Sequence, residues 1–189
     1  MNKKVYDVID KYEPFDDEEK DEKEVMLDFI RNNEDVLTRD NKHGHFTVSL
    51  WAINTLRNKV LMIHHNIYNA WAWVGGHADG DDDFLHVALK ELEEETGISN
   101  PKVLNDSICG LNIVTVDHHY RKGKYVPSHL HYDVEYMVEI DENEKLRVQE
   151  DENSGVEWLD FDTLMNSGIE EKMEPVYSKL IEKTKKLKL

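Results

Sequence analysis

The sequence has one cysteine, no long apolar run and far fewer basic than acidic residues. The single cysteine, Cys109, excludes an intrachain disulfide and is typical of a reducing compartment. No apolar stretch approaches the ~20 residues that cross a bilayer, and the start of the sequence has no apolar core of signal-peptide length. We therefore expect a cytoplasmic protein with no membrane partner.

Basic residues are outnumbered: Lys and Arg total 23 against 40 for Asp and Glu, which gives a formal net charge of −17. Proteins that bind DNA, RNA or anionic membranes use clustered Lys and Arg to replace counterions, so the charge argues against nucleic acid as a partner. A phosphate-rich substrate would also be repelled unless divalent cations neutralised both sides. With 189 residues, the chain is expected to form one domain over 1–189.

The pattern of the sequence changes near residue 43. Residues 1–40 are acidic and predicted to be helical, with a break at Pro14 and a new helix start at Asp16. Two β-rich runs, 45–53 and 59–65, predict a hairpin. The remaining expected elements are strands over 107–117 and 131–140, a polar loop over 121–127, a strand with a turn and helix over 156–164, and a C-terminal helix over 170–188. This order predicts a mixed sheet with helices on its faces.

Three carboxylates share one face of a helix predicted over 84–96. With side chains about 100° apart along a helix, Glu91, Glu94 and Glu95 fall within an arc of about 100°, while Glu93 lies on the other side. Like charges on one face repel each other. The face is either a solvated acidic surface or a divalent-cation site, because hard oxygen ligands on a rigid surface suit Mg²⁺ or Mn²⁺.

The wider segment 76–98 resembles the Nudix box, the signature of the Nudix hydrolase family. That signature runs Gly, five residues, Glu, seven residues, then Arg-Glu-aliphatic-x-Glu-Glu-x-Gly-aliphatic. The positions that match it are Gly76, Glu91, Leu92, Glu94, Glu95, Gly97 and Ile98. Gly97 is also expected to end the helix, because glycine readily adopts the left-handed backbone of a C-cap.

Two positions depart from the signature. Asp82 stands where the first Glu is expected and is one methylene shorter. Lys90 replaces the Arg, which keeps the charge but loses the bidentate fork of a guanidinium. We expect Lys90 to pair with Glu94 four residues later. The departures predict weaker preorganisation rather than loss of activity.

The resemblance implies the α/β Nudix fold. This is an α/β/α sandwich with a mixed sheet and a loop-helix-loop Nudix box at 76–98, here with residues 1–40 as an N-terminal helical extension. It also implies that Mg²⁺ or Mn²⁺ is bound by Glu91, Glu94 and Glu95, joined by the backbone carbonyl of Gly75.

The family cleaves the pyrophosphate of a nucleoside diphosphate linked to another group. The implied partner is therefore a small-molecule nucleotide: an ADP-ribose-like compound, a nucleotide sugar or a nucleoside triphosphate. Catalysis is assigned to Glu94 and to a general base on a loop outside the box. Glu152, six residues before Trp158, is the candidate base or additional metal ligand, with Glu150 as the alternative. A charged hairpin tip at 150–152 is the competing interpretation. A homodimer is a further expectation from the family.

Histidines and one tryptophan complete the predicted site. His129 and His131 are expected to contact phosphate or ribose, and His77, directly after the glycine pair, could donate to a phosphate. Surface histidines or a zinc site are the alternative interpretations. Trp73 could stack on a base or belong to the core.

Two other functions remain open. The chain could be a catalytically weak or inactive module that senses a nucleotide. It could also be similar to isopentenyl diphosphate isomerase, which shares the fold but needs a reactive cysteine, whereas Cys109 lies in an apolar strand context.

Overall fold

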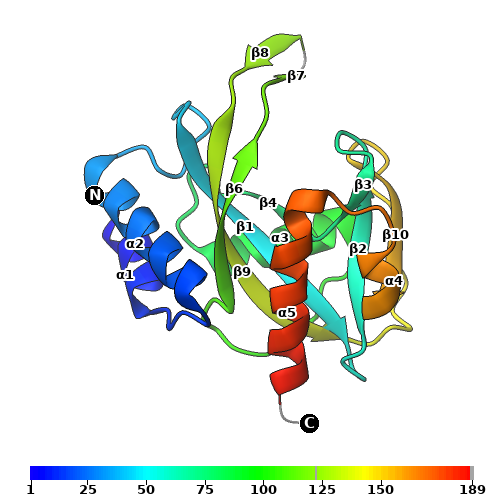
Figure 1. The fold of residues 1–189 in the computed structure, drawn as a ribbon. Helices are drawn as coiled ribbons and strands as arrows, with labels where there is room; N and C mark the ends of the chain where they lie inside the picture. Colours follow the sequence, from blue (N-terminus) through cyan, green and yellow to red (C-terminus); the bar gives the residue numbers. More distant parts are fainter. Residues whose placement is uncertain (122, 188–189) are drawn as a thin grey trace. The chain divides into compact units, whose positions relative to one another are not determined.

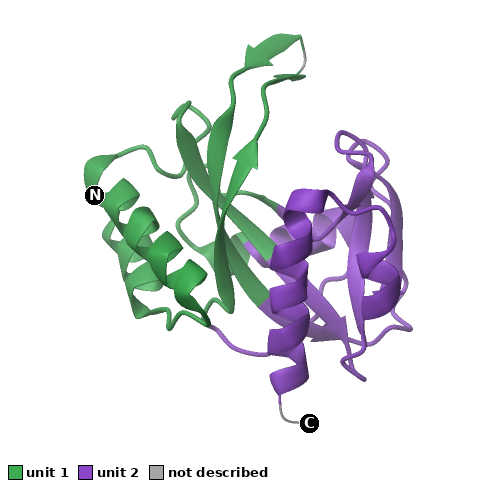
Figure 2. Cartoon of the chain, viewed as in Figure 1, with its two compact units in different colours: residues 1–49, 76–87, 107–136 green, residues 50–75, 88–106, 137–189 purple. Residues whose placement is uncertain are grey.

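The computed structural model describes residues 1–121 and 123–187 (Figure 1). The chain divides into two compact units, coloured separately in Figure 2. Unit 1 comprises residues 1–49, 76–87 and 107–136, and unit 2 comprises residues 50–75, 88–106 and 137–189. The assignment of one domain to residues 1–189 stays a prediction.

The elements form a mixed α/β fold, as the sequence predicted. The described helices are α1 (Lys3–Lys11), α2 (Asp17–Asn32), α3 (Phe84–Thr96), α4 (Phe161–Met165), the short 3-10 helix η1 (Glu171–Met173) and α5 (Glu174–Lys186). The described strands are β1 (Gly44–Asn54), β2 (Lys59–His65), β3 (Ala70–Ala72), β4 (Val74–His77), β5 (Lys102–Val103), β6 (Gly110–Val116), β7 (His119–Arg121), β8 (Lys124–Val126), β9 (His129–Ile140) and β10 (Asn153–Asp160). Hydrogen-bonded neighbours follow the order β10-β2-β1-β9-β5, with β3 beside β2, β4 beside β1 and β6 beside β9.

Helices α1 and α2 of unit 1 lie side by side (Figure 1). Pro14 separates them, and Asp16 caps α2 by accepting a hydrogen bond from the amide of Glu19 at 2.8 Å, as expected for an N-cap. Val5 and Ile9 on α1 and Met26 and Ile30 on α2 are fully buried. The helical N-terminal extension is therefore part of the core of unit 1.

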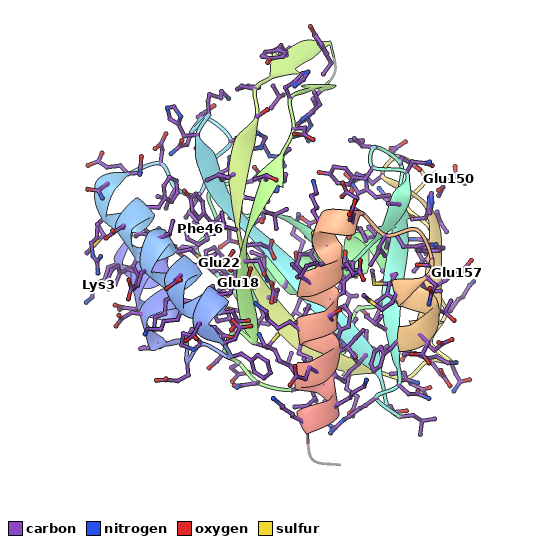
Figure 3. The ribbon with its side chains drawn as sticks, in the orientation of Figure 1. Lys3, Glu18, Glu22, Phe46, Glu150 and Glu157 are labelled. Carbon is purple, nitrogen blue, oxygen red and sulfur yellow. The ribbon has the colours of Figure 1, made fainter. Side chains whose placement is uncertain are left out.

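An aromatic cluster forms the centre of unit 1. The ring of Phe46 on β1 (labelled in Figure 3) lies 5.5 Å from that of Phe84 and 5.8 Å from that of Tyr132. Phe29 of α2 stacks on Tyr132 with the ring centroids 4.1 Å apart. Aromatic pairs at these distances stabilise a fold beyond the free energy gained by burying their apolar surface. The cluster joins α2 to strands β1 and β9.

In unit 2, helix α5 packs through aromatic side chains. Trp51 of β1 is fully buried, its ring centroid lies 5.8 Å from that of Tyr177, and its indole N–H donates to Thr184 Oγ1 at 3.0 Å. Strand β2 pairs with β1, β3 and β10, and each of these pairings is antiparallel. These antiparallel pairings form the sheet of unit 2.

The prediction of a polar loop over 121–127 was wrong. Strands His119–Arg121 and Lys124–Val126 instead pair as an antiparallel ribbon. Tyr120 and Tyr125 face each other across it with ring centroids 5.7 Å apart. Cross-strand aromatic pairs stabilise such ribbons even in a polar sequence. Lys122, which falls in the predicted loop, lies outside the described residues.

The C-terminal helix begins later than predicted, because η1 precedes α5. Lys188, in the predicted range, lies outside the described residues. None of the helices in the described part of the chain combines the length and the apolarity needed to cross a membrane.

Candidate active site

Helix α3 has the predicted bounds, Phe84–Thr96, and places three glutamates at its C-terminal end. Their exposure is graded: Glu95 is 2% exposed, while the side chains of Glu91 and Glu94 are 16% and 53% exposed. The apolar side of the helix is buried through Ala88 and Leu92. The face therefore runs from the interior of unit 2 to solvent.

Glu95 is a buried carboxyl held by backbone. Its Oε2 accepts a hydrogen bond from the amide of Gly75 at 3.1 Å. Burial raises the pKa of Glu95 to about 9, and the charges of Glu91, Glu152 and Glu94 push it in the same direction, while the hydrogen bond from Gly75 opposes them. Since these effects favour the protonated form at neutral pH, a cation beside Glu95 would restore the carboxylate.

Lys90 pairs with Glu94, as the spacing predicted. Its Nζ lies 3.2 Å from Glu94 Oε2 and 3.7 Å from Glu91 Oε1. The hydrogen bond to Glu94 raises the pKa of Lys90, and the charges of both glutamates contribute. Lys90 thus offsets part of the repulsion between the glutamates, although it lacks the two-pronged geometry of arginine.

The three glutamates are not gathered around one point. In the part of the chain that the structure describes, the set of three ligand atoms within 4.8 Å of one another consists of histidines. Like charges on one helix face repel each other, which opposes a closer approach of these carboxylates. Oxygen donors on one rigid helix, one of them buried with a raised pKa, fit a hard divalent cation such as Mg²⁺ or Mn²⁺.

Two residues missed by the sequence analysis fix the end of α3. Asn153, fully buried, donates from Nδ2 to the carbonyl of Glu95 at 3.3 Å. The amide of Arg147 donates to Thr96 O at 2.8 Å, and its guanidinium donates to the carbonyls of Glu93 and Glu94, both at 3.2 Å. These bonds satisfy carbonyls that a helix end leaves without partners. No periodicity or motif in the sequence marks either residue.

Gly97 ends α3 with a φ of +81°, and a Cβ built on it would lie 3.1 Å from Arg147 Cβ. We expect Gly97→Ala to lower the free energy of unfolding by about 1–2 kcal/mol, because an L side chain is disfavoured in this region. Gly168→Ala is the matched control, since Gly168 has the same φ of +81° but open space around its Cβ. Urea denaturation should give the larger loss for Gly97→Ala; equal losses would contradict a contact with Arg147.

The two candidates for the general base precede β10. Glu152 is exposed, and its carbonyl accepts from the amide of Asn66 at 3.0 Å. Glu150 (labelled in Figure 3) accepts through its carbonyl from Asn66 Nδ2 at 3.1 Å. The charge of Glu152 is among those that raise the pKa of Glu95. That electrostatic coupling favours Glu152 over Glu150.

Trp73 lies in unit 2, half-buried. Its ring meets the ring of Tyr177 edge to face at 5.4 Å, and its amide donates to the Tyr177 hydroxyl at 3.3 Å. These contacts fix the orientation of the indole and leave it partly accessible.

His77, His129 and His131 lie in unit 1, where they cluster with His45, a residue the sequence analysis missed. Desolvation by burial lowers the pKa of His77 to about 3 and that of His131 to about 2, with smaller effects from Arg39 and the neighbouring histidines. The imidazoles of His77 and His131 are therefore neutral at physiological pH and supply no positive charge to a phosphate.

Asp82, the shortened acidic position of the box, also lies in unit 1. Its Oδ1 accepts from Lys4 Nζ of α1 at 2.8 Å. The residue is thus engaged by the N-terminal helix.

Comparison with known proteins identifies the family. A family model described as the NUDIX domain matches residues 43–183. A search of curated proteins gives no match.

Solved structures share the fold at low sequence identity. A Nudix hydrolase from M. smegmatis, RenU, has a TM-score of 0.54 and 15% identity, covering 78% of this chain and 89% of that one. The E. coli dihydroneopterin triphosphate pyrophosphohydrolase has a TM-score of 0.55 and 12% identity, with coverage of 72% and 94%. A NUDIX-family hydrolase from Clostridium perfringens has a TM-score of 0.51 and 18% identity, with coverage of 78% and 99%. Because the family model spans most of the chain, the protein belongs to the Nudix hydrolase family, whose members generally use divalent metal ions, and is a pyrophosphohydrolase of the Nudix type.

Proposed function

We propose that the protein cleaves the pyrophosphate bond of a nucleoside diphosphate linked to another group, with Mg²⁺ or Mn²⁺ as cofactor. The observation that carries this proposal is the buried carboxyl of Glu95, which lies on the same face of α3 as Glu91 and Glu94. This carboxyl accepts a hydrogen bond from the amide of Gly75. Without a cation, burial and the neighbouring carboxylates favour the protonated form of Glu95, and a divalent cation bound beside it would stabilise the carboxylate.

The proposed metal ligands are Glu91, Glu94 and Glu95, with the carbonyl of Gly75. The chemistry that a bound Mg²⁺ or Mn²⁺ supplies is neutralisation of charge and polarisation of a phosphate oxygen. Such neutralisation is needed here because the chain itself carries a net charge of −17. The same charge supports a small nucleotide rather than a nucleic acid as substrate.

We assign the role of general base to Glu152, which would accept a proton from the attacking water. Glu94 would act from α3 as a metal ligand. Glu152→Gln is expected to lower kcat about 100-fold, at the low end for loss of a general base. Glu150→Gln is the matched control, because it removes a neighbouring carboxylate in the same segment and is expected to leave kcat unchanged. Steady-state phosphate-release assays would compare the two. A loss confined to Glu150→Gln would transfer the role to Glu150.

Trp73 is the proposed stacking surface for the nucleobase of the substrate, since the edge-to-face contact with Tyr177 leaves the indole ring half-buried. The candidate substrates are ADP-ribose-like compounds, nucleotide sugars and nucleoside triphosphates. The similar structure from E. coli is described as acting on a pterin triphosphate, so a triphosphate of another heterocycle belongs in the same panel.

A substrate panel with Mg²⁺ tests the proposal. Nucleoside triphosphates, dinucleoside polyphosphates and nucleotide sugars are incubated with the purified full chain, and the phosphate products are measured. Hydrolysis of at least one compound is expected, and it should require the divalent ion. Tight binding of a nucleotide without hydrolysis of any compound would favour the sensing module instead.

A further inference from the structure

Four histidine rings gather in unit 1, outside the carboxylate set of unit 2. The ring centroid of His45 on β1 lies 5.1 Å from that of His77, 5.0 Å from that of His129 and 5.1 Å from that of His131. One ring nitrogen from each of His45, His77 and His131 lies within 4.8 Å of the others. Strands β1, β4 and β9 supply these residues. The cluster is therefore assembled by the fold.

Backbone carbonyls fix the tautomers of two of these rings. His129 Nδ1 lies 2.8 Å from the carbonyl oxygen of Pro127, and His45 Nδ1 lies 3.4 Å from that of Asn41. A carbonyl oxygen only accepts, so each Nδ1 carries a proton and Nε2 is the ring nitrogen left for another partner. Histidines that bind metals commonly donate their second N–H in this way.

The Nε2 atom of His45 makes no hydrogen bond to the described residues. His45 is 3% exposed, and among the described residues its buried Nε2 has no hydrogen-bond partner. An unpartnered buried acceptor is uncommon in native proteins and calls for an explanation. His129 Nε2 and His131 Nε2 lie 3.2 Å apart and can share one proton, but none of the described residues offers such a partner to His45 Nε2.

We propose that His45, His77 and His131 form a binding site for a transition-metal ion of the Zn²⁺ class, with His129 positioned to supply a fourth ligand. Imidazole nitrogens favour Zn²⁺ and Co²⁺, whereas Mg²⁺ prefers oxygen ligands. In this assignment His77 and His131 bind metal rather than contacting substrate directly. The site is distinct in chemistry from the carboxylate set and goes beyond the proposed hydrolysis.

The charged side chains that act on this cluster compensate each other. The fixed charges that affect His77 are those of Arg39 and Asp79. The guanidinium of Arg39 donates to both carboxylate oxygens of Asp79, at 2.8 Å and 2.5 Å. A cation at the cluster therefore meets an ion pair instead of an isolated positive charge.

Titration of the full, chelator-treated chain with Co²⁺ tests the site. We expect one equivalent to bind with the visible absorption of four-coordinate, nitrogen-ligated cobalt, to be displaced by Zn²⁺ and to persist in excess Mg²⁺. His45→Gln should weaken the affinity by more than the roughly 10- to 100-fold typical of an outer-shell partner. His77→Gln and His131→Gln should do the same, and circular dichroism establishes that each variant is folded.

Two controls separate this site from its surroundings and from the carboxylates. His43→Gln removes an exposed histidine next to the cluster and should leave Co²⁺ affinity unchanged. Glu94→Gln should keep the cobalt spectrum even where hydrolysis is lost. Absence of a stoichiometric spectrum in the wild type, or its loss in Glu94→Gln with retention in His45→Gln, would overturn the proposal. If no histidine variant folds, the wild-type titration in excess Mg²⁺ decides alone.

Discussion

Glu94→Gln is expected to lower kcat about 1,000-fold, which corresponds to about 4 kcal/mol of transition-state stabilisation. The substitution keeps the shape of the side chain and removes its charge. The side chain of Glu94 is half-exposed, and the partner described for its carboxylate is Lys90, so the substitution breaks no buried side-chain bond. The loss should therefore appear in catalysis while the free energy of unfolding changes little. Steady-state kinetics with Mg²⁺, together with urea denaturation, would measure both.

Glu93→Gln is the matched control for this experiment. Glu93 is an exposed glutamate on the same turn of α3, but its side chain points to the opposite side from the three predicted ligands. The same change in charge is thus made away from the site, and kcat is expected to stay within a factor of about 2 of the wild type. Equal losses in both variants would indicate an effect of overall charge, and full activity of Glu94→Gln would remove this carboxylate from the mechanism.

Trp51→Ala is expected to lower the free energy of unfolding by about 3–5 kcal/mol, the range for truncating a large buried aromatic. Trp51 is fully buried in unit 2, where its ring packs against Tyr177 and Phe161 and its indole N–H reaches Thr184. The substitution would leave a cavity beneath α5 and leave Thr184 without this donor. Urea denaturation followed by far-UV circular dichroism would give the change.

Thr184→Val separates the hydrogen bond from the packing. The valine has nearly the same shape but cannot accept from the indole, so the loss should be about 1–3 kcal/mol, the effect of one unsatisfied buried donor. A loss in Trp51→Ala no greater than that in Thr184→Val would mean that α5 is not held by the packing of Trp51.

Local features of the sequence predicted α3 and its motif well. The bounds of the helix, the left-handed Gly97 and the pairing of Lys90 with Glu94 all depend on residues within a few positions of one another. Such short-range rules are properties of the helix itself. The β7–β8 ribbon was missed because its stability comes from a cross-strand tyrosine pair rather than from an apolar run.

The parts of the site that could not be predicted are brought together by tertiary structure. Asn153 and Arg147 reach the end of α3 from 58 and 54 residues further along the chain, respectively. His45 joins His77 and His131 only once β1, β4 and β9 are in place. No spacing rule connects these positions, so the sequence indicated the chemistry of individual residues but not their partners.

The packing of α1 and α2 bears on how a minimal fragment would be chosen. The family match begins at residue 43, yet Val5, Ile9, Met26 and Ile30 are completely enclosed in unit 1, and Lys4 reaches Asp82 within the motif. Trimming the gene to the limits of the match would uncover the surfaces that these side chains seal. The limits of the family match and the limits of a fragment that keeps this core intact are therefore different.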